Sequence, residues 1–511
     1  MSRFAAQART ATGAYPTGTT GPAATFNGGP GYTVDDRTEV FLLGLTFLTT
    51  AYYESESERV KRYADAVRRV AETDPEWLAG YLKWLRQTAN IRTAAIVGGV
   101  EAARVLGNQR YGPGRDILDS VLRRPDEPAE ALAYHLATHG KPIPAAVRKG
   151  IADAAERVYN EYAAIKYANQ KAAVQPGDVI ALCHPNPRNA VQSQTFTYLM
   201  DLRHKRADPR VDGLDIIAAY RSWTATPTLD LPDGLPWEMA LSRGVEAGLS
   251  RRALWEALID GDKLGYMALI RNMSNLVDAS VSDQHLDTVA SRIADPTRVL
   301  ASKQLPFRFL SAYRAASMRF QWPLQQALNT SLANWPTYPG RTLIALDTSA
   351  SMRNPVGGKN STVTAVESGS LFVAALAARN RGSVDVGLYA TDCGLVSDLP
   401  PDALHACEQI NAQVGRVGHG TNTWPSVAAM LNRVQRPDRV VVVTDGQDNP
   451  SRGDALVPAD IPVYVFDVAG YRNASIDGSR GRYLLSGLND TLFTLPPLLE
   501  SGSAGRWPWQ T

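Results

Sequence analysis

Two aspartates and three hydroxyl side chains stand where buried strands are expected to end. The motif LIALDTSASM is an apolar run that leads straight into Asp347, Ser349 and Ser351. Thr421 lies in the glycine-rich segment GHGTNT, and the apolar run VVVVTDGQDN carries Asp445 near its end. In a doubly wound sheet, ligand-binding groups gather at the carboxyl ends of the strands. Five oxygen-bearing side chains that meet there suit a hard divalent cation, and Mg²⁺ is the favoured ion.

Two other interpretations of these residues remain open. They could be ordinary loop-capping hydroxyls and turn aspartates. A phosphatase that forms an aspartyl-phosphate at Asp347 would need a second aspartate two residues later as general acid, and Ser349 stands there. The sequence also lacks a G-x-S-x-G elbow, a Walker loop and an H-E-x-x-H motif. We therefore expect a binding site and no enzyme activity.

The last third of the chain alternates buried strands with helices. Apolar runs predict strands at Thr342–Leu346, Val384–Ala390, Arg439–Val443 and Val463–Val468, and a helix is expected near Ala365–Arg379. Fully apolar strands separated by helices indicate a parallel, doubly wound α/β sheet.

The preceding 300 residues show helical patterns and no strand pattern. Asp74-Pro75 is a helix start, and apolar residues then recur on one helical face. Further helices are expected at 235–260, 264–280, 284–294 and 305–320, with breaks at Pro236, Gly261, Pro296 and Pro323. No strict sequence period is present, so only the succession of helical patterns with short breaks favours stacked helical pairs in a solenoid or ring.

These patterns divide the chain into three parts. Residues 1–31 are rich in Gly, Thr, Ala and Pro and are expected to form an arm. The helical part then spans 32–338 and the α/β domain 339–511. The boundary is placed in residues 323–340, which hold three prolines and end in Pro-Gly.

Composition excludes several classes of protein. The 511 residues are 44% hydrophobic and 20% charged, which is ordinary for a globular chain, and the net charge of +2 does not indicate a nucleic-acid binder. From residue 340 onward the charge is −2 and before it +4, so the basic excess is small and lies in the helical part. Cys183, Cys393 and Cys407 form no disulfide framework. With no signal-peptide or membrane-span pattern, we expect a cytoplasmic protein without a membrane partner.

The D-x-S-x-S motif with a distant Thr and Asp resembles the metal-ion-dependent adhesion site (MIDAS) of von Willebrand factor A domains. The resemblance covers residues 340–511, and all five matching positions are present. It implies that Asp347, Ser349, Ser351, Thr421 and Asp445 bind the cation directly or through water. A carboxylate from a partner usually completes the metal sphere in that family.

Three helical segments, read together with this motif, resemble the TROVE module of the Ro autoantigen family. They are AAIKYANQKAAVQPGDVIALCHPNP (163–187), LGYMALIRNMSNL (264–276) and LPFRFLSAYRAA (305–316). The resemblance spans roughly residues 20–511. It implies an α-helical, HEAT-like repeat ring followed by a doubly wound (Rossmann-like) von Willebrand factor A domain that closes the ring.

The same resemblance implies a noncoding-RNA-binding protein that acts in a ribonucleoprotein. Ro proteins bind small Y RNAs on the outside of the ring and take the 3′ ends of misfolded RNAs through the hole. In bacteria the family pairs such rings with an exoribonuclease tethered by a Y-like RNA. We therefore expect a monomeric ring in RNA quality control, or a scaffold for an exoribonuclease.

Candidate RNA contacts lie in two clusters of the helical part: Lys166, Lys171, His184 and Arg188, and then Arg203, Lys205 and Arg206, with Arg210 nearby. Cations contact phosphates, and histidine can stack on unpaired bases. Residues 166–221 hold eight Lys/Arg against five Asp/Glu, so a merely solvated basic face remains open, as does a helix-capping role for His184.

Two features depart from the family pattern, and another class of function remains. Asn422 stands where the family often has an aspartate, and Asn169 and Gln170 replace a more basic segment.

The alternative function is a metal-dependent protein-interaction module whose helical part binds no RNA. The sequence does not identify the RNA, the metal, its last ligand or a protein partner, and it leaves open whether the ring is closed or gapped.

Overall fold

The structure is a computed structural model that describes most of the chain. The described residues are 19–24, 30–45, 56–107, 113–168, 172–304, 306–332, 335, 337–355, 364–449, 453–468, 473–474, 476, 481–486, 493, 495–500 and 509. Within these ranges, no helix is both long enough and apolar enough to cross a membrane.

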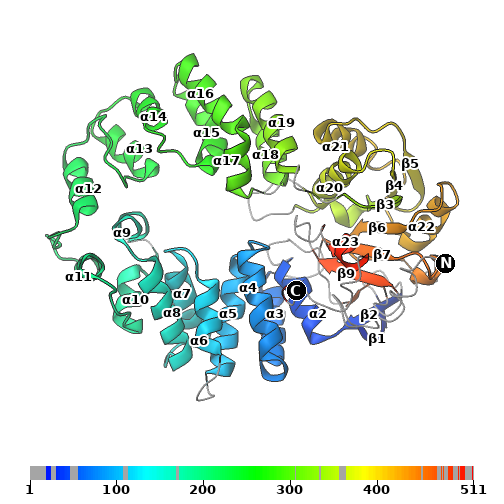
Figure 1. The fold of residues 1–511 in the computed structure, drawn as a ribbon, viewed down its shortest axis with the longest axis horizontal. Coiled ribbons are helices and arrows are strands. Elements are labelled where there is room, and N and C mark those ends of the chain that lie inside the picture. Colours follow the sequence, from blue (N-terminus) through cyan, green and yellow to red (C-terminus); the bar gives the residue numbers. More distant parts are fainter. Residues whose placement is uncertain are drawn as a thin grey trace.

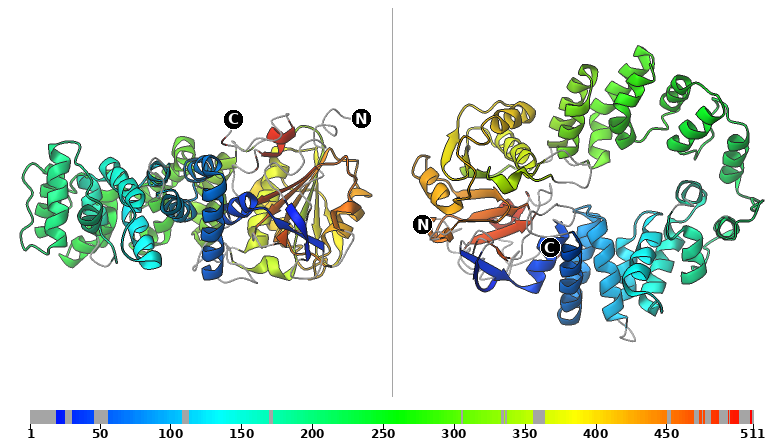
Figure 2. Two further views of the ribbon diagram at one scale, coloured as in Figure 1. Left: turned by 90° about the horizontal axis from the view of Figure 1, so that it is seen from below. Right: turned by 180° about the vertical axis from the view of Figure 1, so that it is seen from behind.

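The helices form an arc around a central space, and an α/β domain fills the gap between the two ends of the arc (Figure 1). The first half of the arc consists of α2 (Asp36–Leu45), α3 (Glu56–Thr73), α4 (Pro75–Gln87), α5 (Thr93–Leu106), α6 (Gly114–Val121), α7 (Glu127–His139), α8 (Ala145–Val158), α9 (Glu161–Tyr167), α10 (Pro176–Cys183) and α11 (Ala190–Arg203). The view along the ring plane in Figure 2 shows this arc and the α/β domain side by side.

The second half of the arc leads back to the α/β domain. It consists of α12 (Asp215–Ala225), α13 (Trp237–Glu246), α14 (Arg251–Asp260), α15 (Tyr266–Asp278), α16 (Asp283–Ala294), α17 (Pro296–Ser302), α18 (Pro306–Ala315) and α19 (Met318–Leu332). In Figure 1, α17 and α18 lie nearer the central space, and α16 and α19 lie on the outside. The predicted helical ring followed by an α/β domain is therefore confirmed.

Local sequence explains where the helices begin. The Asp74 carboxylate caps α4 by accepting a hydrogen bond from the Trp77 amide at 3.1 Å, and Pro75 occupies the first helical position, where no amide is needed. The predicted apolar face of α4, which includes Leu78 and Leu82, is buried. This helix start is confirmed as predicted.

The α/β domain is built on a six-stranded sheet with the order β5-β4-β3-β6-β7-β9, in which only the edge strand β5 is antiparallel. Its strands are β3 (Thr342–Asp347), β4 (Val384–Tyr389), β5 (Cys393–Val396), β6 (Arg439–Thr444), β7 (Val463–Asp467) and β9 (Arg482–Ser486). Its helices are α20 (Ala365–Arg379), α21 (Ala403–Asn411), α22 (Thr423–Leu431) and α23 (Leu495–Glu500), with 3₁₀ turns at Ala350–Arg353 and Gly453–Leu456. The four predicted strands and the helix at 365–379 are confirmed, whereas β5 and β9 were not predicted.

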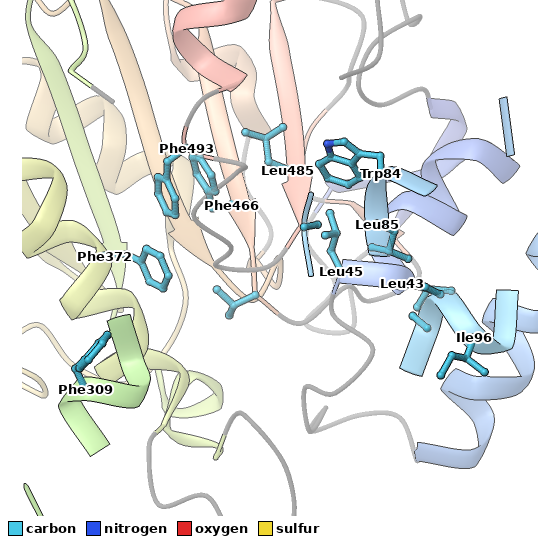
Figure 3. Close-up of a cluster of buried hydrophobic side chains, with 14 of the residues drawn as sticks. Leu43, Leu45, Trp84, Leu85, Ile96, Phe309, Phe372, Phe466, Leu485 and Phe493 are labelled. Atoms are coloured by element: carbon cyan, nitrogen blue, oxygen red, sulfur yellow. The ribbon is translucent and has the colours of Figure 1, made fainter. Parts of the chain in front are cut away.

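The hydrophobic core is continuous between the two parts of the chain. Figure 3 shows Leu45 and Trp84 of the helical part beside Leu485 of β9, and all three side chains are buried. Phe466 of β7 pairs with Leu485 in register and so lies on the same face of the sheet, where the rings of Phe372, Phe466 and Phe493 stack with centroids 4.5 to 4.8 Å apart. The α/β domain is thus joined to the arc by packed apolar side chains.

Two expectations about the ends of the helical part were wrong. The described pieces of the expected arm, β1 (Thr19–Ala24) and β2 (Pro30–Val34), form an antiparallel hairpin, and β2 pairs with β8 (Asn473–Ala474) of the α/β part. Pro323 was expected to break a helix but lies inside α19. The buried side chains of Phe320, Leu324 and Leu328 hold this helix against its neighbours and outweigh the one backbone hydrogen bond that a proline removes.

Candidate metal centre and candidate RNA-binding residues

Parallel neighbours β3, β4 and β6 bring the predicted metal ligands to one edge of the sheet. Asp347 is the last residue of β3, and Asp445 directly follows β6. Ser349 and Ser351 lie in the turn after β3, where the 3₁₀ turn begins at Ala350. Because β3 and β6 pair in register from Thr342 to Leu346, the two carboxylates leave the sheet at the same level.

Backbone and hydroxyl donors fix the first carboxylate. Asp347 is fully buried and accepts hydrogen bonds from the Ser349 amide at 2.8 Å and from the Thr444 hydroxyl at 2.7 Å. The hydroxyls of Ser349 and Ser351 lie 3.2 Å apart. Thus both oxygens of Asp347 are held in place while the two serine hydroxyls stand next to each other.

Compared with Asp347, the second carboxylate, Asp445, is less fully bonded. Its Oδ2 atom is buried and has no hydrogen-bond partner. Burial, and then the negative charge of Asp347, raise the pKa of Asp445, and burial likewise raises the pKa of Asp347. Two buried carboxylates that repel each other, one with an open oxygen, are stabilised by a cation between them.

The loop that carries Thr421 is tied to both strand-end turns. The Ala350 amide donates to the His419 carbonyl at 3.0 Å, and the Asn449 amide donates to the Thr421 carbonyl at 2.8 Å. Thr421 itself is 2% exposed. Asn422, which departs from the family pattern, joins the same loops, since its side chain donates to the Thr391 carbonyl at 2.7 Å and accepts from Asn449 at 3.0 Å.

The donor set fits a hard, oxygen-binding cation. The structure brings all five predicted residues to one edge of the sheet. Within the ranges that the structure describes, no group of three or more His, Cys, Asp or Glu side chains could hold a metal. A cation here would therefore need the hydroxyls as well as the two carboxylates, which favours Mg²⁺ over a softer metal. The metal and its ligands stay a prediction.

The predicted RNA contacts do not converge on one site. Lys166 lines a cavity of about 290 Å³ together with Tyr167 and Pro176, at the amino end of α10. His184 caps the carboxyl end of α10, so the eight residues of this helix, about 12 Å in length, separate Pro176 from His184. Arg188 follows His184 in the loop before α11, and Lys171 lies outside the described residues. His184 has φ 55°, in agreement with the helix-capping alternative.

The second basic cluster is largely paired with carboxylates. Arg203 lies 2.8 Å from Asp178, and both Arg206 and Arg210 contact Asp201, at 3.1 and 2.9 Å. Hydrogen bonds from Arg210 lower the pKa of Asp201 to about 2 despite its burial. Lys205 is exposed in a left-handed turn. Much of this basic surface is therefore used inside the protein.

Sequence reasoning missed a pair of arginines in the second half of the arc. Partial burial lowers the pKa of Arg308 on α18, and the positive charge of nearby Arg271 on α15 lowers it further. Both side chains are exposed. Each lies inside one of the three segments that carried the family resemblance, so asking which cations those motifs bring together would have found them.

A ring of helices closed by a von Willebrand factor A-type α/β domain defines the class of protein. The chain is similar to the crystal structure of the RO (RSR) protein of Deinococcus radiodurans, with a TM-score of 0.61 over 91% of this chain and 99% of that chain. The two sequences are 17% identical, so this likeness shows the fold.

Sequence comparisons point to a family. The TROVE domain model matches residues 215–327, which span α12 to most of α19. A segment of 78 residues is 42% identical to telomerase protein component 1 of Rattus norvegicus and of Mus musculus. This segment is 15% of the chain and 3% of each relative, so the chain spans only a small part of those proteins. Residues 215–327 are therefore similar to the TROVE domain family.

Proposed function

We propose that this protein binds RNA on its helical ring. The observation that carries the proposal is the TROVE match to α12–α19, because these helices form one complete side of the ring. The match includes both segments that hold Arg271 and Arg308. Two guanidinium groups that repel each other are stabilised by a phosphate between them, since each can donate to its oxygens.

The finer proposal concerns the kind of RNA. A ring with a central space and a basic pair on one side suits a folded RNA with an unpaired end: the folded part binds outside and the end enters the ring. This corresponds to a Y RNA-like or misfolded noncoding RNA in a cytoplasmic ribonucleoprotein. The protein would act as a monomeric ring for RNA quality control, or as a scaffold for an exoribonuclease held through the RNA, without turnover of its own.

A salt titration of RNA binding tests the proposal. A hairpin RNA with a ten-nucleotide single-stranded tail is bound on filters between 50 and 400 mM KCl, with a blunt hairpin as the control. If about five phosphates are neutralised, the log–log slope is about −3.5 to −4.5. The tailed RNA is expected to bind more tightly than the blunt one. Absent binding, or a flat salt dependence, overturns the proposal.

A second candidate function is a metal-dependent protein-interaction module. The observation that favours it is the buried, unpartnered Oδ2 of Asp445, which a cation shared with a partner's carboxylate would satisfy. Capture of a protein with Mg²⁺ but not with EDTA, together with absent RNA binding, would support this function. Capture of RNA that persists in EDTA would support the first.

A further inference from the structure

The joint between α4 and the α/β domain contains a tryptophan from the far end of the chain. Trp509 lies among three aromatic side chains of α4, with ring centroids 5.3 Å from Trp77, 5.3 Å from Tyr81 and 5.4 Å from Trp84. The first two contacts are edge-to-face, the geometry that aromatic rings prefer. A residue that follows the sheet in sequence is thus packed on the first part of the helical arc.

The space that the Trp509 ring occupies between Trp77, Tyr81 and Trp84, here called the aromatic seat, depends on a glycine. A Cβ atom placed on Gly80, in the middle of α4, would lie 2.3 Å from Cδ1 of Trp509. A glycine inside a helix costs stability relative to alanine. Its presence here is explained by the close approach of the indole ring, which no larger residue would allow.

The chain before Trp509 is anchored on the sheet. Glu500, at the end of α23, pairs with Arg439 at the start of β6 through contacts of 2.6 and 2.8 Å. Arg439 is 3% exposed on its side chain, so this pair is largely shielded from water. Eight residues lie between Glu500 and Trp509 in the sequence, so the two residues can be at most about 30 Å apart. Glu500 is held on the α/β domain and Trp509 on α4, and the chain joins the two.

Among the described residues, two further kinds of contact cross this joint. The β2–β8 pairing involves only Tyr32 with Ala474 and Thr33 with Asn473. The apolar contact runs from α2 and Trp84 to β9, as Figure 3 shows for Leu45 and Leu485. The indole of Trp509 adds a large aromatic side chain to a joint that has little backbone pairing.

We propose that Trp509 is a clasp that holds the helical arc closed against the α/β domain. When the indole sits over Gly80, Trp509 ties α4 to the α/β domain through the chain that links it to Glu500. When it leaves, the joint depends on the short β2–β8 pairing and the α2–β9 contact, and the ring opens more often. The aromatic seat is filled by Trp509 of the same chain. The proposal does not depend on RNA binding.

Hydrogen exchange of α4 in the full-length protein tests the clasp with substitutions on both sides. Trp509→Ala removes the indole, and exchange of the amides in α4 is expected to become roughly tenfold faster. Gly80→Ala blocks the seat, and we expect faster exchange here as well, although alanine alone would strengthen the helix. Trp322→Ala, which removes a 64%-exposed tryptophan of α19, is the control and should change nothing in α4.

The double variant separates the clasp from a local effect. In a Trp509→Ala background, Gly80→Ala can act only through helix propensity and should slow exchange in α4, so the effect of Gly80→Ala changes sign. Small-angle scattering should show a longer maximum dimension for both single variants. Slower exchange in α4 with Gly80→Ala alone, or unchanged exchange and dimensions with Trp509→Ala, would overturn the proposal.

Discussion

Two buried carboxylates in different parts of the molecule have opposite surroundings. Glu101 on α5 is fully buried and contacts Arg68 at 2.8 Å, Tyr134 at 2.7 Å and His139 at 2.7 Å. These partners come from α3 and α7, so one side chain joins three helices. Asp445 in the α/β domain is buried to a similar degree, yet its Oδ2 has no partner.

The difference distinguishes a buried carboxylate that the protein itself satisfies from one with an oxygen that accepts no hydrogen bond. A buried charge is costly unless the protein satisfies it, and Glu101 is satisfied from within. Asp445 is not, and the like charge of Asp347 raises its pKa, so the predicted cation would satisfy it. The cations also differ in their surroundings: Arg206 and Arg210 share the carboxylate of Asp201, whereas burial and then the positive charge of Arg271 lower the pKa of Arg308.

The largest expected effect is at the candidate metal centre. Asp445→Asn should lower Mg²⁺ affinity about 1,000-fold, about 4 kcal/mol, because a charged ligand is lost. In EDTA the same variant should melt at a higher temperature than the parent, since the repulsion with Asp347 is gone. Isothermal titration and thermal unfolding measure the two effects.

Asp398→Asn is the control for that experiment. Asp398 has φ 55°, a conformation that asparagine tolerates well, and it lies in the same domain. Its Mg²⁺ affinity and melting temperature should match the parent. Unchanged Mg²⁺ affinity in Asp445→Asn would mean that the cation, if one binds, lies elsewhere.

The next largest effect is at the satisfied carboxylate. Glu101→Gln should lower the free energy of unfolding by about 3 kcal/mol with or without Mg²⁺, because the buried side chain loses its charge-assisted contacts with Arg68 and His139. Glu246→Gln, which touches only an exposed pair with Arg243, should change it by less than about 0.5 kcal/mol. Chemical denaturation measures both. A Mg²⁺-dependent effect at Glu101 would contradict the structural role.

The pH dependence follows from the same contacts. Burial opposes the charge on Glu101, but hydrogen bonds from His139, Tyr134 and Arg68 outweigh it and lower its pKa. A lowered pKa in the folded state means that the stabilisation is present above the ordinary value of 4.5 and is lost as the pH falls below it. The parent should therefore lose stability relative to Glu101→Gln on acidification.

The candidate metal centre was predictable because strand ends are geometrically constrained. Parallel pairing of β3 with β6 carries Asp347 and Asp445 to one edge, whatever the intervening 97 residues do. Buried strands with a continuous apolar run, such as the four valines inside Arg439–Thr444, are distinctive in sequence. Short or half-exposed strands, such as Cys393–Val396, lack that signal and were missed.

Surface sites on helices were not predictable in the same way. Lys166 and His184 are close in sequence, but α10 separates them, and the pairing of Arg203 with Asp178 depends on how α10 and α11 pack. The N-terminal hairpin was missed because its partner β8 lies more than 400 residues away in sequence. Sequence patterns report local periodicity, and these contacts are tertiary.

A smaller effect is expected for the arginine pair of the TROVE segment. Arg271→Gln with Arg308→Gln should weaken binding of the tailed RNA about 30-fold, about 2 kcal/mol, and reduce the salt slope by about two. Arg243→Gln with Arg252→Gln removes the same charge from the same segment, but each of these arginines already pairs with a glutamate. This control should lose less than about threefold. Equal losses would show that only net charge matters.

The smallest expected effect concerns His184. His184→Ala would be a poor test, because alanine at φ 55° is strained and could destabilise the cap of α10. His184→Asn keeps a residue that accepts this conformation and removes the imidazole. If His184 stacks on an unpaired base, RNA affinity should fall about threefold, roughly 0.6 kcal/mol, with an unchanged melting temperature. If affinity is unchanged, His184 is a capping residue only, and the outer contact is to be sought among Arg203, Lys205 and Arg206.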